Sequence, residues 1–214
     1  MYPPLKLFER VAEPEDLEEV LAIEALTDDS VRLLAGRLER IPPEDRLTGP
    51  GAGWVMGAFM HPSPSRFNDD AVGAYYTAKD RETAIRETVY HKEQFLAATS
   101  ESPLDISMRM LVAQLNGVFH DIRGDGSRWP DLYHATSYTA SQAFAQELRG
   151  RRSAGITYDS VRHSGGECAA VFMPRAVSNC TPRNSSPIPG TGAESPQFAR
   201  RAVVLRPPRP TITG

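Results

Sequence analysis

Four polar residues stand at the edges of elements that the sequence predicts, and their side chains are of types that bind or transform substrates. Arg66 lies in a loop and Tyr76 in a short aromatic run, whereas Glu87 lies two turns into a helix and Ser160 ends a strand. Guanidinium groups bind anions and carboxylates stabilise positive charge. Each residue also has an ordinary structural explanation: Glu87, four residues before His91, is typical of an exposed helix charge. Their spacing alone therefore assigns no reaction.

Short motifs of nucleotide-binding and hydrolytic enzymes are absent from the sequence. It has no GxxxxGK[ST], no GxGxxG after a predicted strand, no HExxH and no GxSxG. His61, His91 and His163 do not share ligand spacing with one another, and the cysteines, Cys168 and Cys180, form no CxxC pair. The sequence therefore predicts no metal site.

Composition limits the class of protein. The 214 residues, 40% hydrophobic and 24% charged, suit one domain with a core of its own. The net charge is −3 and no basic stripe is visible, so direct nucleic-acid binding is not expected. There is no signal peptide and no apolar run long enough to cross a bilayer, so no membrane association is expected. With two sparse cysteines, these features predict a cytoplasmic protein.

Hydrophobic patterning predicts the elements that would position the four residues. Periodicity, capping residues and strand-forming runs indicate a mixture of helices and strands without regular βαβ alternation, which favours an α+β fold. The segment from Ala58 to Phe67 is predicted to be a loop because of Pro62 and Pro64. One predicted helix begins at Pro14, and three others cover residues 29–38, 81–98 and 137–149. The predicted strands cover residues 74–78, 104–112, 155–160 and 168–173.

The order of these segments resembles the RES domain, a family named for its Arg, Glu and Ser. Ser65-Arg66-Phe67-Asn68 is similar to the family's Arg-aromatic-Asn/Ser step, and Gly73 to Ala78 to its ALYLA strand. Glu82 to Glu87, ETAIRE, resembles its ETALAE helix, and Gly155 to Arg162, GITYDSVR, its GIVYPSVR strand. Further matches, including Gly165 to Phe172, extend the resemblance over residues 4–175.

The resemblance implies an ADP-ribosyltransferase-like mixed sheet with flanking helices and a pocket for NAD⁺. Residues 1–48 would form an N-terminal helical segment of the RES domain, and residues 49–177 its catalytic core. NAD⁺ would be the substrate, and no bound cofactor or metal is implied.

The resemblance also implies a role for each matched polar residue. Breaking the bond between nicotinamide and ribose builds positive charge on the ribose, which the carboxylate of Glu87 would stabilise. Arg66 would bind a phosphate or ribose oxygen, and Tyr76 would stack on nicotinamide or ribose. Ser160 would hydrogen-bond the substrate or position Glu87, and Arg162 would be a further ligand for the pyrophosphate.

Family membership implies a bacterial toxin that hydrolyses or phosphorolyses NAD⁺ and is neutralised by an Xre-type helix-turn-helix antitoxin. Two alternatives stay open. The enzyme could be an ADP-ribosyltransferase that modifies a protein, since the two reactions differ only in what attacks the ribose. The chain could instead be an inactive remnant that only binds antitoxin.

Two departures from the family favour the remnant. Longer members carry an Arg-containing strand before the stretch matched by Pro3 to Glu9, and this chain begins at Met1. Residues 178–214 are rich in Pro, Arg and Ser where the family has an aromatic strand, so a disordered tail and a frameshift near residue 178 are expected. Within this tail, only Ala202 to Leu205 could pair as a strand.

Overall fold

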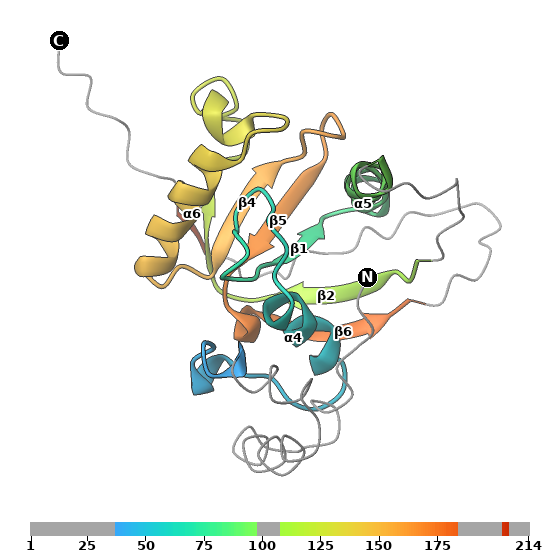
Figure 1. Ribbon diagram of the computed structural model, residues 1–214, viewed down its shortest axis with the longest axis vertical. Coiled ribbons are helices and arrows are strands. Elements are labelled where there is room, and N and C mark those ends of the chain that lie inside the picture. Colours follow the sequence, from blue (N-terminus) through green and yellow to red (C-terminus); the bar gives the residue numbers. More distant parts are fainter. Residues whose placement is uncertain (1–36, 98–107, 184–202, 206–214) are drawn as a thin grey trace.

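A mixed five-stranded sheet forms the centre of the computed structural model, which describes residues 37–97, 108–183 and 203–205. Its strands are β1 (Tyr75–Ala78), β3 (Val118–Asp121), β4 (Gly155–Asp159), β5 (Glu167–Val171) and β7 (Val203–Leu205). Their spatial order is β1-β5-β4-β3-β7 (Figure 1). β5 pairs antiparallel with β1 and β4, and β3 pairs parallel with β4 and β7. The predicted α+β class with a mixed sheet is therefore confirmed.

A second, two-stranded sheet pairs β2 (Leu111–Leu115) with β6 (Val177–Pro182) in antiparallel register. The strand predicted over 104–112 was thus placed too early: β2 begins at Leu111, residues 108–110 are not strand, and 104–107 lie outside the described residues.

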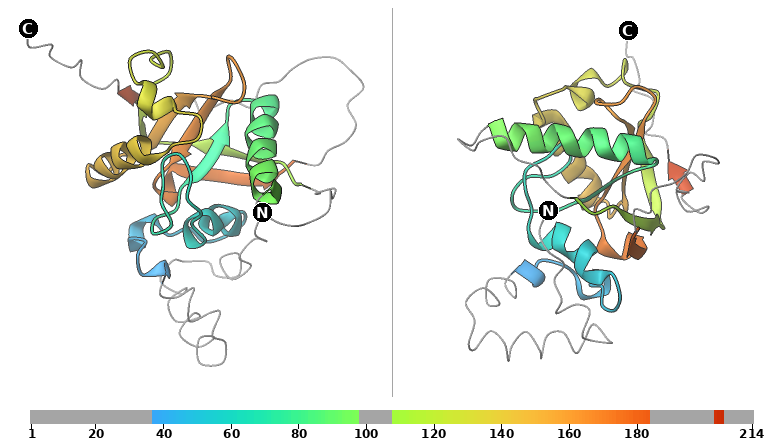
Figure 2. Two further views of the ribbon diagram at one scale, coloured as in Figure 1. Left: turned by 45° about the horizontal axis from the view of Figure 1, so that its top comes forward. Right: turned by 90° about the vertical axis from the view of Figure 1, so that its right-hand side faces the viewer.

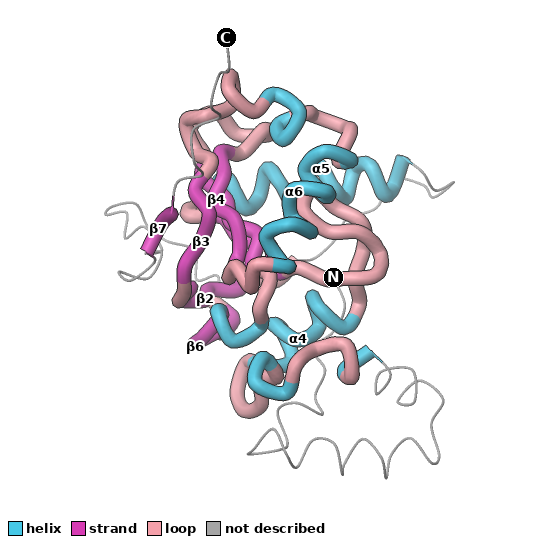
Figure 3. Tube along the Cα trace, turned by 90° about the vertical axis from the view of Figure 1, so that its left-hand side faces the viewer, coloured by secondary structure: helices cyan, strands magenta, loops and turns pink. Residues whose placement is uncertain are grey.

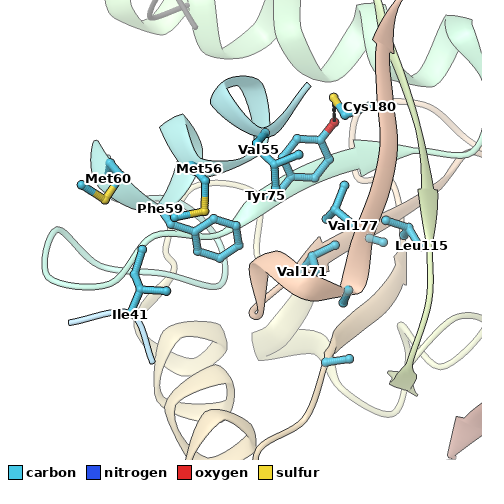
Figure 4. Packing of buried hydrophobic residues seen from close by; sticks show 14 of the residues in the cluster. Ile41, Val55, Met56, Phe59, Met60, Tyr75, Leu115, Val171, Val177 and Cys180 are labelled. Carbon is cyan, nitrogen blue, oxygen red and sulfur yellow. Dashed lines mark hydrogen bonds between the residues drawn. The ribbon is translucent and has the colours of Figure 1, made fainter. Parts of the chain in front are cut away.

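Strand β6 crosses residue 178, where the sequence predicted that a disordered tail begins. Val177 and Cys180 are buried, and the Cys180 thiol lies 3.8 Å from the Tyr75 hydroxyl (Figure 4). Burial of these apolar side chains is favourable, which explains why this part of the chain is ordered. Strand β7 lies within the single stretch of the tail that the sequence marked as able to pair.

Three helices pack around the strands: α4 (Ala52–Met60), α5 (Arg81–Ala97) and α6 (Thr139–Gly150). Figure 3 shows α5 and α6 on the same side of the strands. Both agree closely with the predicted helices, whereas those predicted from Pro14 and over 29–38 lie largely outside the described residues. Among the described helices, none is both long and apolar enough to cross a bilayer. Short 3₁₀ turns complete the described part: η1 (Pro43–Asp45), η2 (Pro130–Tyr133) and η3 (Pro174–Ala176).

Helix α4 was missed by sequence analysis, which assigned its last residues, from Ala58 onward, to a loop. Val55, Met56, Phe59 and Met60 are all buried in this helix (Figure 4). A helix buried on several faces has no polar stripe, so its sequence lacks the periodicity that identifies a surface helix.

The side chains of β5 point alternately into two hydrophobic cores, one on each face of the sheet. Ala169 and Val171 point into the core that contains α4, whereas Cys168, Ala170 and Phe172 point into the core beneath α6. Successive side chains of a strand point to opposite faces, so this register decides which β5 residues can reach the site described below.

The glycines before α4 provide a matched test of this packing. Gly49 and Gly51 both have φ +84°, but a Cβ on Gly49 would meet nothing, whereas one on Gly51 would lie 2.1 Å from the Cys180 carbonyl oxygen. We expect Gly49→Ala to lower the free energy of unfolding by about 1 kcal/mol, through the backbone conformation alone. Gly51→Ala should cost about 3 kcal/mol because β6 must also move. Equal losses in urea unfolding would contradict this account.

Candidate active site

A pocket of about 250 Å³ lies between α5 and the β1 edge of the five-stranded sheet. Figure 2 shows α5 running alongside this edge. The walls of the pocket come from the loop before β1, from β1 and β5, from α5, and from the segments that precede α6 and follow β4. The lining residues are Ser65, Arg66, Tyr76, Thr77, Ala78, Ala84, Glu87, Thr88, His91, Lys92, Tyr138, Tyr158, Arg162 and Cys168.

Helix α5 presents one face to the pocket. Asp80 caps its first turn, since the Asp80 carboxylate accepts a 2.8 Å hydrogen bond from the Thr83 amide. Ala84, Glu87, Thr88 and His91 then follow at the three- and four-residue spacing of one helix face. The cap fixes where the helix begins and the helical period carries Glu87 to the pocket wall.

The Glu87 carboxylate is held by Ser160. The Ser160 hydroxyl donates a 2.6 Å hydrogen bond to Glu87 Oε1, although the two residues are 73 positions apart in sequence. The same hydroxyl accepts hydrogen bonds from the backbone amides of Arg162 (3.1 Å) and His163 (2.9 Å). Ser160 does not line the pocket, so in this arrangement it orients Glu87 and does not face a ligand.

Arg66 places a buried positive charge at the pocket wall. The residue is 5% exposed, and its Nη1 donates to the carbonyl oxygens of Leu132 (2.8 Å) and His134 (2.9 Å). Its guanidinium carbon lies 5.0 Å from the centre of the Tyr138 ring. Among the described residues no carboxylate pairs with Arg66, so its charge is available to an anionic ligand.

Tyr76 lines the pocket with its ring while its hydroxyl is engaged elsewhere. The hydroxyl accepts a 2.8 Å hydrogen bond from the Phe67 amide and donates one of 2.9 Å to Asn68 Oδ1. Burial, opposed by the Phe67 hydrogen bond, raises the pKa of Tyr76 to about 12, so the hydroxyl keeps its proton. Tyr76 therefore ties the loop that carries Arg66 to β1 and leaves only its ring to contact a ligand.

This anchoring role predicts a stability effect. Tyr76→Phe leaves the Phe67 amide and the Asn68 Oδ1 atom without their hydrogen bonds to the Tyr76 hydroxyl. We therefore expect a loss of about 1–2 kcal/mol in the free energy of unfolding. Tyr90→Phe is the matched control, since the Tyr90 hydroxyl has no hydrogen bond within the described chain, and should cost less than about 0.5 kcal/mol. Comparable losses for the two variants in urea titrations would refute the anchoring role.

Arg162 lines the pocket and contacts two neighbouring segments. Its guanidinium carbon lies 3.4 Å from the centre of the Tyr90 ring on α5, and its Nη2 donates to the Ala135 carbonyl oxygen. Arg162 thus connects α5 to the segment before α6. An anion bound in the pocket would lie near this cation.

The structure brings together all five residues that the resemblance singled out. Arg66, Tyr76, Glu87 and Arg162 line the pocket, and Ser160 lies directly behind Glu87. Their roles toward a substrate stay predictions.

Several lining residues had not been predicted as site residues: Thr88, His91, Lys92, Tyr138, Tyr158 and Cys168. The helical period counted from Glu87 would have found Thr88 and His91. Burial, reinforced by the charges of Arg162 and Arg66 and opposed by Glu87, lowers the pKa of His91 and favours its neutral form.

Cys168 lies behind the carboxylate, with its thiol 4.0 Å from Glu87 Oε1. Burial, then the Glu87 charge, raises the pKa of Cys168 to about 12, so the thiol is protonated and a poor nucleophile. Only the register of β5 reveals that Cys168 reaches this site.

No group of three His, Cys, Asp or Glu residues suited to hold a metal ion occurs in residues 37–97, 108–183 and 203–205. The charged groups that line the pocket are one carboxylate, Glu87, and three cations, Arg66, Lys92 and Arg162. The arrangement suits a ligand that is anionic in one part and develops positive charge in another.

Comparison with known proteins assigns the chain to a family. The model of the RES domain matches residues 38–190, which is more than half of the chain and includes the whole pocket. The chain belongs to the RES domain family. A curated relative from Sinorhizobium fredii (strain NBRC 101917 / NGR234), the uncharacterized protein y4oC, is 30% identical over 128 residues. The match covers 57% of this chain and 53% of the relative, so the chain spans about half of the length of that relative.

Proposed function

We propose that this RES protein cleaves the bond between nicotinamide and ribose in NAD⁺. The observation that carries the proposal is the Glu87 carboxylate, held by Ser160 at 2.6 Å. The same pocket contains Arg66 and Arg162, neither of which has a carboxylate partner among the described residues. The family is associated with NAD-related toxins, which gives the pocket its candidate substrate.

The chemistry requires a carboxylate at the position where positive charge develops. When the C1′–N bond of NAD⁺ breaks, its electron pair stays on the pyridine nitrogen and neutral nicotinamide departs. The ribose becomes oxocarbenium-like, and the negative charge of Glu87 stabilises it. The oxygen of water or inorganic phosphate then forms the new bond to C1′, and the proton that it carries passes to solvent or to Glu87. Because the hydrogen bonds of Ser160 hold the carboxylate in place beforehand, little reorganisation is needed during the reaction.

The cations of the pocket suit the remainder of the substrate. Arg66 is buried, Arg162 is partly exposed, and both line the pocket, so the pyrophosphate of NAD⁺ can be bound by two guanidinium groups. The volume of about 250 Å³ is slightly below the range of about 300–1,000 Å³ typical of small-molecule sites. We infer that the pocket holds the nicotinamide-ribose end and that the adenosine end lies outside it.

The proposal includes a biological setting. Cleavage of NAD⁺ would deplete a cytoplasmic metabolite and arrest growth, and an Xre-type antitoxin that blocks the pocket would neutralise the toxin.

The decisive experiment incubates the purified full chain with NAD⁺ labelled in its adenylate half, with and without inorganic phosphate and with a cell extract. Release of nicotinamide with free ADP-ribose is the expected result for hydrolysis, and ADP-ribose phosphate for phosphorolysis. In parallel, tightly controlled expression in bacteria should lower cellular NAD⁺ and stop growth, and co-expression of an Xre-type antitoxin should restore both.

Two results would overturn the proposal in different ways. A labelled protein band without free ADP-ribose would assign the site to ADP-ribosyl transfer. A folded protein that leaves NAD⁺ intact in every condition but binds an antitoxin would identify an inactive remnant.

A further inference from the structure

Two side-chain hydrogen bonds, one helical turn apart, join the β4–β5 loop to α5. In one, Ser160 binds Glu87; in the other, the Thr83 hydroxyl oxygen lies 2.7 Å from His163 Nδ1. Arg162 on the Tyr90 ring and His163 Nε2, 3.7 Å from Glu82 Oε1, are further contacts. Thr83 and Glu87 are four residues apart and therefore share a face of α5. Since Thr83 is completely buried, its hydroxyl must be satisfied within the protein.

The direction of each hydrogen bond at Thr83 can be deduced. The Thr83 hydroxyl is 2.6 Å from Asp80 Oδ2. Burial raises the pKa of Asp80, but the hydrogen bonds from the Thr83 hydroxyl and amide, together with the charge of His163 and the Glu82 amide, hold this pKa below its usual value. An ionised carboxylate only accepts, so the single hydroxyl proton of Thr83 goes to Asp80. His163 must then donate to Thr83 from a protonated Nδ1.

The loop is closed on itself by backbone hydrogen bonds that converge on Ser160. The Ser160 amide donates to the Gly166 carbonyl oxygen (2.8 Å), and the Gly166 amide donates to that of His163 (3.0 Å). The amides of Arg162 and His163 both donate to the Ser160 hydroxyl oxygen. With its two acceptor positions and its one proton used, the Ser160 hydroxyl has no capacity left for a substrate.

The close approach of the loop to α5 depends on Gly166. A Cβ at Gly166 would lie 2.5 Å from Thr83 Oγ1 and 3.1 Å from His163 Nδ1. Loop and helix are therefore in contact at the hydrogen-bonded pair itself, and a displacement of His163 moves its amide, which is one of the two donors to Ser160.

We propose that Asp80, Thr83 and His163 are positioning residues: their hydrogen-bonded series fixes the 160–166 loop against α5 and, through Ser160, sets the orientation of the Glu87 carboxylate. The proposal rests on the proposed function, in which Glu87 acts on the substrate. It assigns to Ser160 a role behind the carboxylate and none in substrate binding.

The first test concerns the hydrogen-bond directions and is independent of activity. Long-range ¹H–¹⁵N NMR spectra of the full chain should show that neutral His163 carries its proton on Nδ1. The slow amide exchange expected for Arg162 and His163 should become about tenfold faster in Thr83→Val, which keeps the shape of the side chain but cannot accept from His163. Thr83→Ser should restore slow exchange. A proton on Nε2, or unchanged exchange in Thr83→Val, would overturn the proposal.

The second test separates positioning from general stability. We expect Thr83→Val and His163→Leu to lower kcat for NAD⁺ cleavage by about 10- to 100-fold with little change in KM, because the carboxylate is misplaced and the binding surface remains. Thr83→Ser and His163→Asn, whose amide can donate from the position of Nδ1, should recover most of the rate. Thr181→Val, an exposed change on β6, is the control. Unchanged kcat per folded molecule in Thr83→Val would overturn the positioning role.

Failure of the proposed function can be distinguished from failure of this inference. If the native chain does not turn over NAD⁺, the proposed function fails, and the proton position and the amide exchange still decide whether the hydrogen-bonded series fixes the loop. If the native chain is active and Thr83→Val exchanges and reacts like it, only the positioning proposal fails.

Discussion

Glu87→Gln is expected to abolish most of the NAD⁺-cleaving activity, with kcat lowered by about 10²- to 10³-fold. The substitution retains an oxygen that can accept from Ser160, so the 2.6 Å hydrogen bond and the local structure should survive while the negative charge is lost. Initial rates of nicotinamide release from the purified variant measure the effect. Since the charge acts mainly in the transition state, KM should change much less than kcat.

Glu93→Gln is the matched control for this prediction. Glu93 is an exposed glutamate on the same helix, outside the pocket lining, and its substitution should leave kcat within about twofold of the native value. A Glu87→Gln variant that is folded, with a native melting temperature, and that retains full activity would eliminate Glu87 as the catalytic residue. It would also remove the main support for the proposed function.

Arg66→Gln is expected to weaken binding of phosphate-bearing ligands by about 10- to 100-fold, the loss of one charge-assisted interaction. Calorimetric titration with ADP-ribose, which carries the pyrophosphate, should show this loss. Titration with nicotinamide, which carries no phosphate, should show little change. The contrast tests whether the buried guanidinium recognises the anionic part of the substrate.

Arg66 also supports the η2 segment through Leu132 and His134, so its removal has a structural effect that needs a control. Arg149 is comparable: its guanidinium bonds the carbonyl oxygens of Gly73 (3.0 Å) and Phe172 (3.5 Å) and does not line the pocket. Arg149→Gln should therefore destabilise the fold and leave ADP-ribose affinity per folded molecule unchanged. Equal loss of ADP-ribose and nicotinamide binding in Arg66→Gln would show that the pocket had collapsed, and would refute specific anion recognition.

Local sequence patterns identified most of the elements that surround the site. Helices α5 and α6 and strands β1, β4 and β5 were all predicted, because capping residues and the periods of amphipathic elements are local properties. Helix α4 and strand β3 were missed. Helix α4 is buried on several faces, and β3 is short and follows a turn at Gly117, so neither has a distinctive period.

The matched motifs supplied the candidate residues but not their arrangement. Arg66, Tyr76, Glu87 and Ser160 could be named from the resemblance, whereas nothing in the spacing of Glu87 and Ser160 indicates a hydrogen bond across 73 positions. That contact exists because β1 and β4 both pair with β5, which brings the loop after β4 to the first turns of α5. Cys168 and Tyr138 reach the pocket for similar reasons: the register of β5 places Cys168 there, and the path of the loop before α6 places Tyr138 there.

The sequence by itself determined the α+β class, the membership of the RES family and the residues with which the chemistry is proposed. These depend on local periodicity and on the order of short motifs, both of which can be read along the chain. Only the tertiary structure decided that Ser160 stands behind Glu87, that the Tyr76 hydroxyl is engaged with Asn68, and that Thr83 and His163 join helix to loop. Such contacts are made between distant segments, and their geometry follows from strand register and helix packing, which no local pattern encodes.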